Sequence, residues 1–237
     1  MSVYSNTKLI CACLIVFAWF SLGYSQTRAR QRKEVIEAVR VCNRFKTLMA
    51  EDLDFDRAFE ATFVRNAARR REIAITEGEF HGDNLASVDT ATLVDAFKSR
   101  MQLLFLMMPL FSPETDEVAA TFFPPKFKEA LKREPPEAAN EFASYAAQLK
   151  RDVADFRAHL DQLAQRNPNV AERIRQFKRD FAKRIDPPAQ QVKPLTAYSR
   201  GRVLGLKEEY YQIGEYAVIR EGREMRIIGI RFFSRLF

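Results

Sequence analysis

A regular apolar repeat in the second half of the chain constrains the fold most. Seven apolar side chains follow one another at alternating steps of four and three residues: Phe142, Ala146, Leu149, Val153, Phe156, Leu160 and Leu163. This spacing places them along one face of a helix, in the manner of a heptad repeat. Because the positions between them are largely charged, the sequence predicts a long helix that buries only this stripe, here called the heptad seam.

A second helix is expected directly after the seam. The turn sequence Asn167-Pro168-Asn169 interrupts the repeat. Beyond it, a further apolar stripe recurs at helical spacing: Val170, Ile174, Phe177, Phe181 and Ile185. The short connection predicts an antiparallel helical hairpin in which the two stripes pack together. The alternative is a seam that stays exposed and binds a protein partner.

The first half of the chain also has helical patterns. Residues 33–50 are amphipathic, residues 56–72 read as a second helix capped by Asp54 or Asp56, and residues 89–111 as a third capped by Asp89. The third helix becomes apolar on all sides, which is typical of a central buried helix. Its uninterrupted apolar run from Leu103 is too short for a bilayer, which needs about 20 residues. Residues 126–134, between two proline pairs, predict a further short helix.

After Pro187-Pro188 the chain becomes rich in Tyr, Val, Ile and Phe, which indicates strands. A two-residue turn at Glu221-Gly222 predicts a β-hairpin. Its register would pair Arg220 with Arg223, Val218 with Met225, Tyr216 with Ile227, and Gly214 with Gly229. Two facing glycines would leave a bare patch that a helix or ligand can approach. The predicted fold class is α+β, mostly helical with a helical hairpin and a small C-terminal antiparallel β-sheet.

The N-terminal segment is typical of a secretory signal peptide. Lys8 precedes an apolar run over residues 9–23, and Gly23 and Ser25 suit a cleavage site that leaves Gln26 first. Residues 1–25 are therefore predicted to be a signal peptide of an exported, periplasmic or secreted protein. The alternative is a membrane anchor over residues 9–24, because the basic residues that follow resist translocation. Residues 26–188 then form a helical region, and the β-hairpin region 189–237 packs on it as one domain.

Charge and cysteine content narrow the function. The chain has a net charge of +7, but its Lys and Arg residues are scattered and interrupted by acids. This pattern favours a solvated face over a nucleic-acid groove, so no nucleic-acid partner is expected. Cleavage would leave Cys42 as the only cysteine, which excludes an intrachain disulfide. Its position on an apolar helical face predicts a buried, inert thiol.

One polar cluster raises the question of a metal site. In the stretch ITEGEFHGDN, acidic residues and one histidine occupy alternate positions: Glu77, Glu79, His81 and Asp83. They are weak candidate metal ligands, because strong zinc patterns contain two or more Cys or His residues at fixed spacing. Gly78 and Gly82 also interrupt the stretch. The prediction is a polar loop, with no bound metal and no cofactor.

The two ends of the mature chain together resemble a known superfamily. The segments FKTLMAEDLDFDRAFEATF and YAVIREGREMRIIGI are similar to the first helices and last strands of the nuclear transport factor 2-like superfamily. That resemblance implies helices wrapped around a curved antiparallel sheet, whose enclosed cone serves as a ligand pocket or an enzyme site. This chain departs from the pattern, because proline-rich and heptad helices stand where the middle strands belong. No functional residue is carried over.

Three functions are compared on these grounds. The first is a non-enzymatic envelope or secreted protein whose helical hairpin or sheet face contacts a protein partner, with membrane contact only through an uncleaved N-terminus. The second is an apolar-ligand binder between the sheet and the methionine-bearing helix, with these candidate residues: Met101, Phe105, Met107, Gly214 and Gly229. The third is an enzyme of unknown type. The sequence has no phosphate-binding glycine loop and no nucleophile motif, so enzyme activity is not expected.

Overall fold

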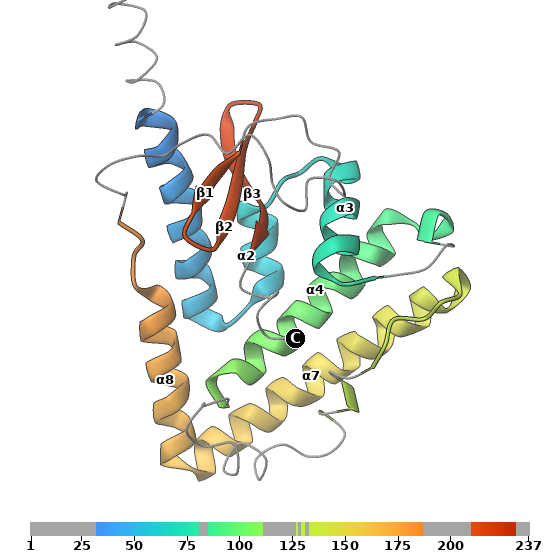
Figure 1. The fold of residues 1–237 in the computed structure, drawn as a ribbon. Helices are drawn as coiled ribbons and strands as arrows, with labels where there is room; N and C mark the ends of the chain where they lie inside the picture. The colour runs from blue at the N-terminus through green and yellow to red at the C-terminus, as the bar shows by residue number, and fades with distance from the viewer. Residues whose placement is uncertain are drawn as a thin grey trace, which may run out of the picture.

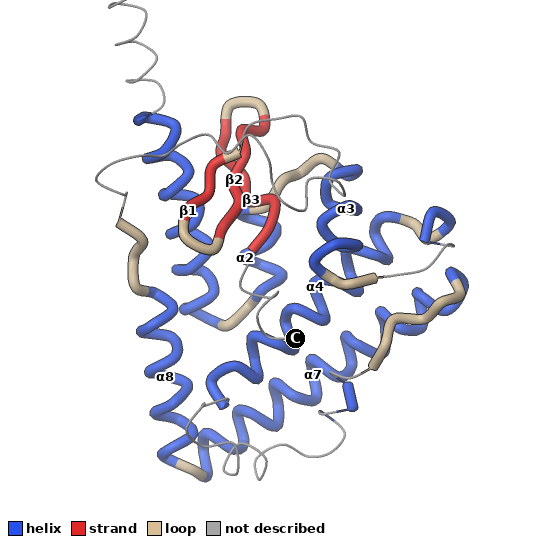
Figure 2. Tube along the Cα trace, in the orientation of Figure 1, coloured by secondary structure: helices blue, strands red, loops and turns tan. Residues whose placement is uncertain are grey.

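The computed structural model describes residues 32–80, 85–110, 127, 129–130, 133–186 and 210–230. Within these ranges the protein is α+β, mostly helical with a small antiparallel sheet near the C-terminus, as the sequence predicts (Figures 1 and 2). The predicted signal segment and all but the end of the basic stretch after it lie outside the described residues. In the part of the chain that is described, no helix combines the length and apolarity that crossing a bilayer requires.

The first described helix covers residues 32–52, close to the range that its amphipathic pattern predicts. Its apolar face is buried and includes Val39, Cys42, Phe45 and Met49. A sharp turn follows, in which Leu53 has a φ of 52°. The next helix, α2 (Phe55–Thr62), starts at the predicted cap, because the Asp54 carboxylate accepts a hydrogen bond from the Arg57 N–H at 3.0 Å.

The predicted single helix over residues 56–72 is wrong, since the chain leaves the helical conformation after Thr62 and re-enters it in α3 (Ala67–Glu77). The physical reason is a tertiary contact. Phe63 forms a parallel β-bridge with Ile227, and the Val64 N–H donates to the Ile227 carbonyl at 3.1 Å. The Glu221 carboxylate then accepts the next two backbone N–H groups, at 2.7 and 3.0 Å. These bonds replace the helical ones that the segment gives up.

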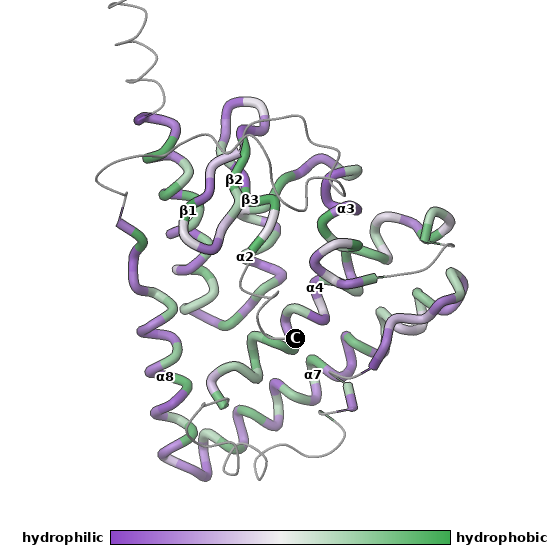
Figure 3. Tube along the Cα trace, viewed as in Figure 1, coloured by the Kyte–Doolittle hydropathy of each residue, from purple (hydrophilic) through white to green (hydrophobic). Residues whose placement is uncertain are grey.

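Helix α4 (Thr90–Met107) is the central element, and short 3-10 turns flank it at Leu85–Ser87 and Met108–Leu110. Asp89 caps it as predicted, accepting from the Thr92 N–H at 2.9 Å. Every residue from 101 to 107 is buried, which confirms the expected burial on all sides. Figure 3 shows the hydrophobic colouring of this C-terminal half.

Helices α7 (Phe142–Arg166) and α8 (Pro168–Ala182) follow the short turn Ala139–Glu141 and form the predicted consecutive helix pair. Asn167 ends the first and caps the second, since its side chain accepts from the backbone N–H groups of Asn169 and Val170. Of the short helix predicted at residues 126–134, only residues 127, 129 and 130 are described as helical. The Phe127 ring packs edge-on against Phe156, with centroids 4.7 Å apart.

The heptad seam is buried inside the chain, but its main partner is not the one that the sequence suggests. Helix α7 runs alongside α4 (Figure 1), and α8 meets it mainly near their shared turn. Phe142 and Leu149 belong to the same core cluster as Phe97, whereas Phe156 and Leu160 pack with the apolar end of α4. Helix α4 is the main partner of α7 because it is apolar on all sides, so one of its apolar faces is available to pack against α7.

The sheet has three antiparallel strands in the order β1 (Tyr211–Ile213), β2 (Tyr216–Glu221) and β3 (Glu224–Ile230). It is joined to the first helix, where the Arg220 guanidinium lies 2.9 Å from the Glu37 carboxylate. One hydrophobic core contains residues of both the helices and the sheet.

The predicted hairpin turn is one residue too early, so the cross-strand partners next to it are displaced by two residues. Glu221 pairs with Glu224, so the turn residues are Gly222 and Arg223, and Arg220 pairs with Met225. Gly222 takes the first turn position with a φ of 62°, a conformation that glycine adopts without steric cost.

A bulge beside Val218 then shifts the register again, so that Ala217 pairs with Gly229. Gly214 lies instead in the turn between β1 and β2, with a φ of 56°. The two glycines therefore do not face each other, and the bare patch predicted between them does not form.

Candidate functional site

The first candidate site from the sequence, the polar stretch at residues 75–84, is only partly described. Glu77 ends α3 and is buried, whereas the Glu79 carboxylate lies 3.9 Å from the Arg100 guanidinium. His81 and Asp83 lie outside the described residues. Within the described ranges, no three metal-ligating side chains come together. The structure therefore tests neither the weak metal site nor the alternative prediction of a polar loop without metal.

The second candidate site, a cavity between the sheet and the methionine-bearing helix, has a counterpart in the structure. A cavity of about 390 Å³ lies where the first helix, the end of α4, α8 and the turn between β1 and β2 meet. The helices and the segment after α8 contribute these apolar side chains: Phe45, Phe105, Met108, Phe177, Phe181 and Ile185. The sheet adds Gly214, Tyr216 and Ile230. These nine residues define what is called the apolar pocket below.

Two of the five predicted pocket residues, Phe105 and Gly214, line the apolar pocket. The others do not. Met101 is buried in the main core, and Met107 packs in the cluster between α4 and α7. Gly229 lies within β3, opposite Ala217. Met108, the next methionine along, reaches the cavity instead, because the chain tightens into a 3-10 turn there.

The floor of the apolar pocket is a cluster of buried aromatic rings. Phe45 is fully buried, and its ring centroid lies 6.3 Å from Phe181 and 5.8 Å from Tyr216. Phe105 meets Phe181 edge-on, with centroids 5.7 Å apart and planes at 89°. Edge-to-face arrangements are a favoured geometry for aromatic pairs and add to the stability that burial provides. Phe45 and Phe105 are buried, whereas Phe177 and Phe181 on α8 are only half-buried.

Helix α8 forms one wall because polar contacts hold it against the first helix. The Asn43 amide donates to the Ile185 carbonyl at 3.0 Å, and its oxygen accepts from the Ile185 N–H at 2.8 Å. The Lys178 ammonium also donates to the Glu51 carbonyl at 2.7 Å. Phe177 and Phe181 of α8, and Ile185 just after it, therefore face the pocket, and only the N-terminal end of α8 packs beside the heptad seam.

Polar groups also reach the apolar pocket, namely Lys46, Asp180 and Glu215. The Lys46 ammonium lies 5.2 Å from the centroid of the Phe181 ring, a cation–π arrangement. Asp180 is engaged already, because Lys183 lies 2.6 Å from it and the Gln176 amide donates to it at 2.7 Å. The hydrogen bond from Lys183 holds the pKa of Asp180 below its usual value.

Two further titratable groups, Tyr216 in the pocket wall and the nearby Cys42 in the core, stay protonated at neutral pH. Burial raises the pKa of the Cys42 thiol and of the Tyr216 phenol. A thiol reacts as the thiolate, so Cys42 is unreactive in this environment. The buried, inert cysteine expected from the sequence is found in this position.

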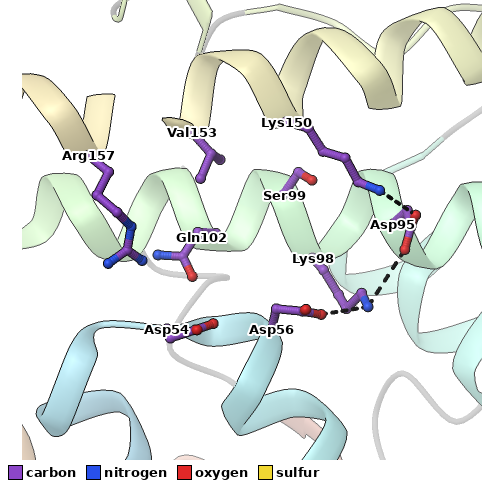
Figure 4. A pocket seen from close by; sticks show the side chains of 9 residues that line it. All are labelled: Asp54, Asp56, Asp95, Lys98, Ser99, Gln102, Lys150, Val153 and Arg157. Atoms are coloured by element: carbon purple, nitrogen blue, oxygen red, sulfur yellow. Dashed lines mark hydrogen bonds and ion pairs between the residues drawn. The ribbon is translucent and has the colours of Figure 1, made fainter. Parts of the chain in front are cut away.

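A second cavity, of about 230 Å³, lies between α2, α4 and α7 and is polar (Figure 4). Charged groups of both signs line it in equal number: Asp54, Asp56, Asp95, Lys98, Lys150 and Arg157. Lys98 lies 2.5 Å from Asp56 and 3.2 Å from Glu60, and Lys150 lies 2.7 Å from Asp95. Burial lowers the pKa of Lys98, but the hydrogen bonds that its ammonium donates to Asp56 and Glu60 outweigh this effect and leave the pKa raised.

Side chains that line this polar cavity bind the backbone of the turn at Leu53. The buried Gln102 side chain accepts from the Phe55 N–H at 2.6 Å and donates to the Leu53 carbonyl at 2.5 Å. The Arg157 guanidinium donates to the same carbonyl at 3.2 Å. The sequence analysis missed this site because its residues come from three distant segments that no local spacing connects. Lys98 and Lys150 pair with Asp56 and Asp95, whereas Asp54 caps α2 and Arg157 binds backbone carbonyls, so these side chains connect the three helices.

Comparisons of the chain with protein-family models, with curated proteins and with solved structures found no match. No activity, ligand or residue role is therefore transferred from another protein, and the function rests on the geometry of this chain.

The heptad seam is not available as a binding stripe. Leu149, Phe156 and Leu160 are at most 4% exposed. Among the residues that the structure describes, Ile36 is the one large hydrophobic side chain that is exposed, at 36%. The seam is therefore part of the core of the chain.

Proposed function

We propose that the protein binds a small apolar molecule in the apolar pocket and acts by binding rather than by catalysis. The observation that carries this proposal is the cavity of about 390 Å³ with a floor of packed aromatic rings. Ligand sites are typically cavities of about 300–1,000 Å³, lined by apolar and aromatic side chains with a few polar groups. The pocket has that size and composition.

The energetics support the same function. An apolar molecule placed on these rings would remove its own surface and theirs from water, which is favourable by roughly 25 cal/mol per Å² buried. Phe177 and Phe181 on α8 are only half-buried, so they lie where the pocket meets solvent and a ligand can enter.

The buried heptad seam favours this proposal over a protein partner at the helical hairpin, because an apolar partner surface would need an exposed stripe. Export is retained as part of the proposal. Its support is the N-terminal segment, with Lys8, the apolar run 9–23 and the small residues Gly23 and Ser25. The proposed protein is thus an exported carrier or sensor of an apolar molecule.

The test is a titration of the full chain with N-phenyl-1-naphthylamine, a neutral apolar dye that fluoresces when removed from water. We expect saturable binding and a rise in melting temperature, because a ligand of the folded state stabilises it. Ile185→Trp should reduce binding by filling the pocket. Arg175→Trp adds the same bulk on an exposed position of α8 and should bind normally. Dye binding that is absent, or equal in both variants, would refute the proposal.

A further inference from the structure

The apolar pocket contains one cation that the proposed function does not yet use. Lys46 lies one helical turn after Cys42 on the first helix and is half-buried in the pocket wall. Its ammonium lies over the Phe181 ring. Among the described residues, no carboxylate lies within ion-pair distance of it, although Asp180 and Glu215 line the same pocket. Burial lowers the pKa of Lys46, as expected for a cation without a carboxylate partner.

The free-energy cost of partly burying the Lys46 ammonium is only partly offset by its surroundings. Taking a charge out of water costs free energy unless it is paired, and one aromatic face returns only a part of that cost. An anion at the pocket mouth would supply the missing partner. The surrounding wall, with Phe105 and Phe181, would still require the rest of the ligand to be apolar.

We infer that the ligand is a single-chain amphiphile with a carboxylate head, of the fatty-acid class. The head forms a charge-assisted contact with Lys46, and the hydrocarbon chain lies on Phe45 and Phe105. This inference rests on the proposed function, since it concerns the ligand of the same pocket. It specifies that the head group is negatively charged and that Lys46 binds it.

The main alternative is a ligand with a positively charged head group, because Glu215 also lines the pocket and would attract it. The positions of the two residues favour the anion. Lys46 lies against the aromatic wall, whereas Glu215 follows the exposed Gly214 in the turn between β1 and β2. A side chain added at Gly214 would meet no atom within 4 Å, so this turn borders open space. A contact made there is more fully screened by water.

The experiment compares three ligands of equal chain length, namely decanoate, decanol and decylamine, as competitors of the neutral dye on the full chain. In the native protein we expect decanoate to displace the dye at a concentration at least about tenfold lower than decanol, the scale of a hydrogen bond to a charged group. Lys46→Met keeps the apolar stem and removes the charge. It should abolish the preference for decanoate and leave the affinity for decanol unchanged.

Two control variants complete the design. Lys46→Arg keeps the charge and should retain the preference, and Glu215→Gln removes the competing carboxylate and should not weaken decanoate binding. Melting curves check that each variant is folded. Equal displacement by decanoate and decanol in the native protein overturns the inference alone, and so does a preference for decylamine that Glu215→Gln removes. Failure of the dye and of all three ligands to bind overturns the proposed function as well.

Discussion

Asn43 and Ile185 are 142 positions apart in the chain and bind each other through two hydrogen bonds, of 3.0 and 2.8 Å, between one amide side chain and one backbone unit. This pair fixes the end of the α8 segment against the first helix. It lies at the same end of α8 as Phe181, whose ring contacts Phe45 in the apolar pocket.

Asn43→Ala should lower both stability and ligand binding. Each lost hydrogen bond is worth about 0.5–1.5 kcal/mol, and a buried partner left unpaired adds to that cost. We expect a reduced free energy of unfolding in urea and weaker dye binding. Asn140→Ala, at an exposed position before α7, is the matched control and should change neither. An unchanged dye affinity in Asn43→Ala would show that this contact does not shape the pocket.

The heptad seam should behave as core in mutagenesis. Leu149 and Phe156 are 1% and 0% exposed, and truncation of such residues to Ala costs about 2–5 kcal/mol. Leu149→Ala and Phe156→Ala should each lower the midpoint of urea unfolding, whereas Gln162→Ala on the exposed face of α7 should not. Near-neutral effects, accompanied by the loss of a co-purifying protein, would instead identify the seam as a partner surface.

Gln102→Leu tests the role of the polar cavity. The substitution keeps the volume of the side chain but leaves the buried Phe55 N–H without its acceptor. An unsatisfied buried donor costs about 1–3 kcal/mol. The measurement is again urea unfolding, with Gln162→Leu on the exposed face of α7 as the control. Equal stability of the two variants would mean that the turn at Leu53 does not depend on this bond.

Lys46 should make stability depend on pH in the alkaline range. Because burial lowers its pKa in the folded protein, the unfolded chain binds more protons between that value and the ordinary lysine pKa. Stability from this residue therefore rises as pH increases through that window. Cys42, Asp180 and Glu215 also face this region, so the comparison is made against Lys46→Met, which should lack this contribution. Identical pH profiles of melting temperature would contradict the prediction.

Export predicts a specific mature N-terminus. Mass-spectrometric sequencing of the native protein should find Gln26 as the first residue, because Gly23 and Ser25 suit the cleavage site. An intact N-terminus in the membrane fraction would show that residues 9–24 act as an anchor. Soluble protein with an intact leader would contradict both alternatives.

Local signals in the sequence were sufficient for most of the helical structure. The caps at Asp54 and Asp89 and the turn at Asn167 are found where side chains can accept the free N–H groups of a helix start. The apolar run before Met108 is buried on all sides as predicted. These features depend only on neighbours within one or two turns, and the sequence lists those neighbours directly.

The errors occur where a distant segment supplies the deciding contact. Residues 63–66 have a helical pattern, yet they leave the helix because Ile227 and Glu221 bind their backbone. The heptad seam packs mainly on α4 rather than on α8, because proximity in sequence does not decide which apolar face is the best partner. The hairpin turn lies one residue later than predicted because Gly222 adopts a positive φ at its first position, and a bulge shifts the register further along the strands.

The sequence by itself determined the fold class, the helix boundaries near caps, and two residues of the apolar pocket, Phe105 and Gly214. It could not bring Lys46 and Phe181 together, because the first helix and α8 are far apart in the sequence and meet through tertiary contacts such as Asn43–Ile185. A pocket is the space left between elements, so its position depends on how they pack. Periodicity within one element reports which face is buried, and only the tertiary structure decides what lies opposite that face.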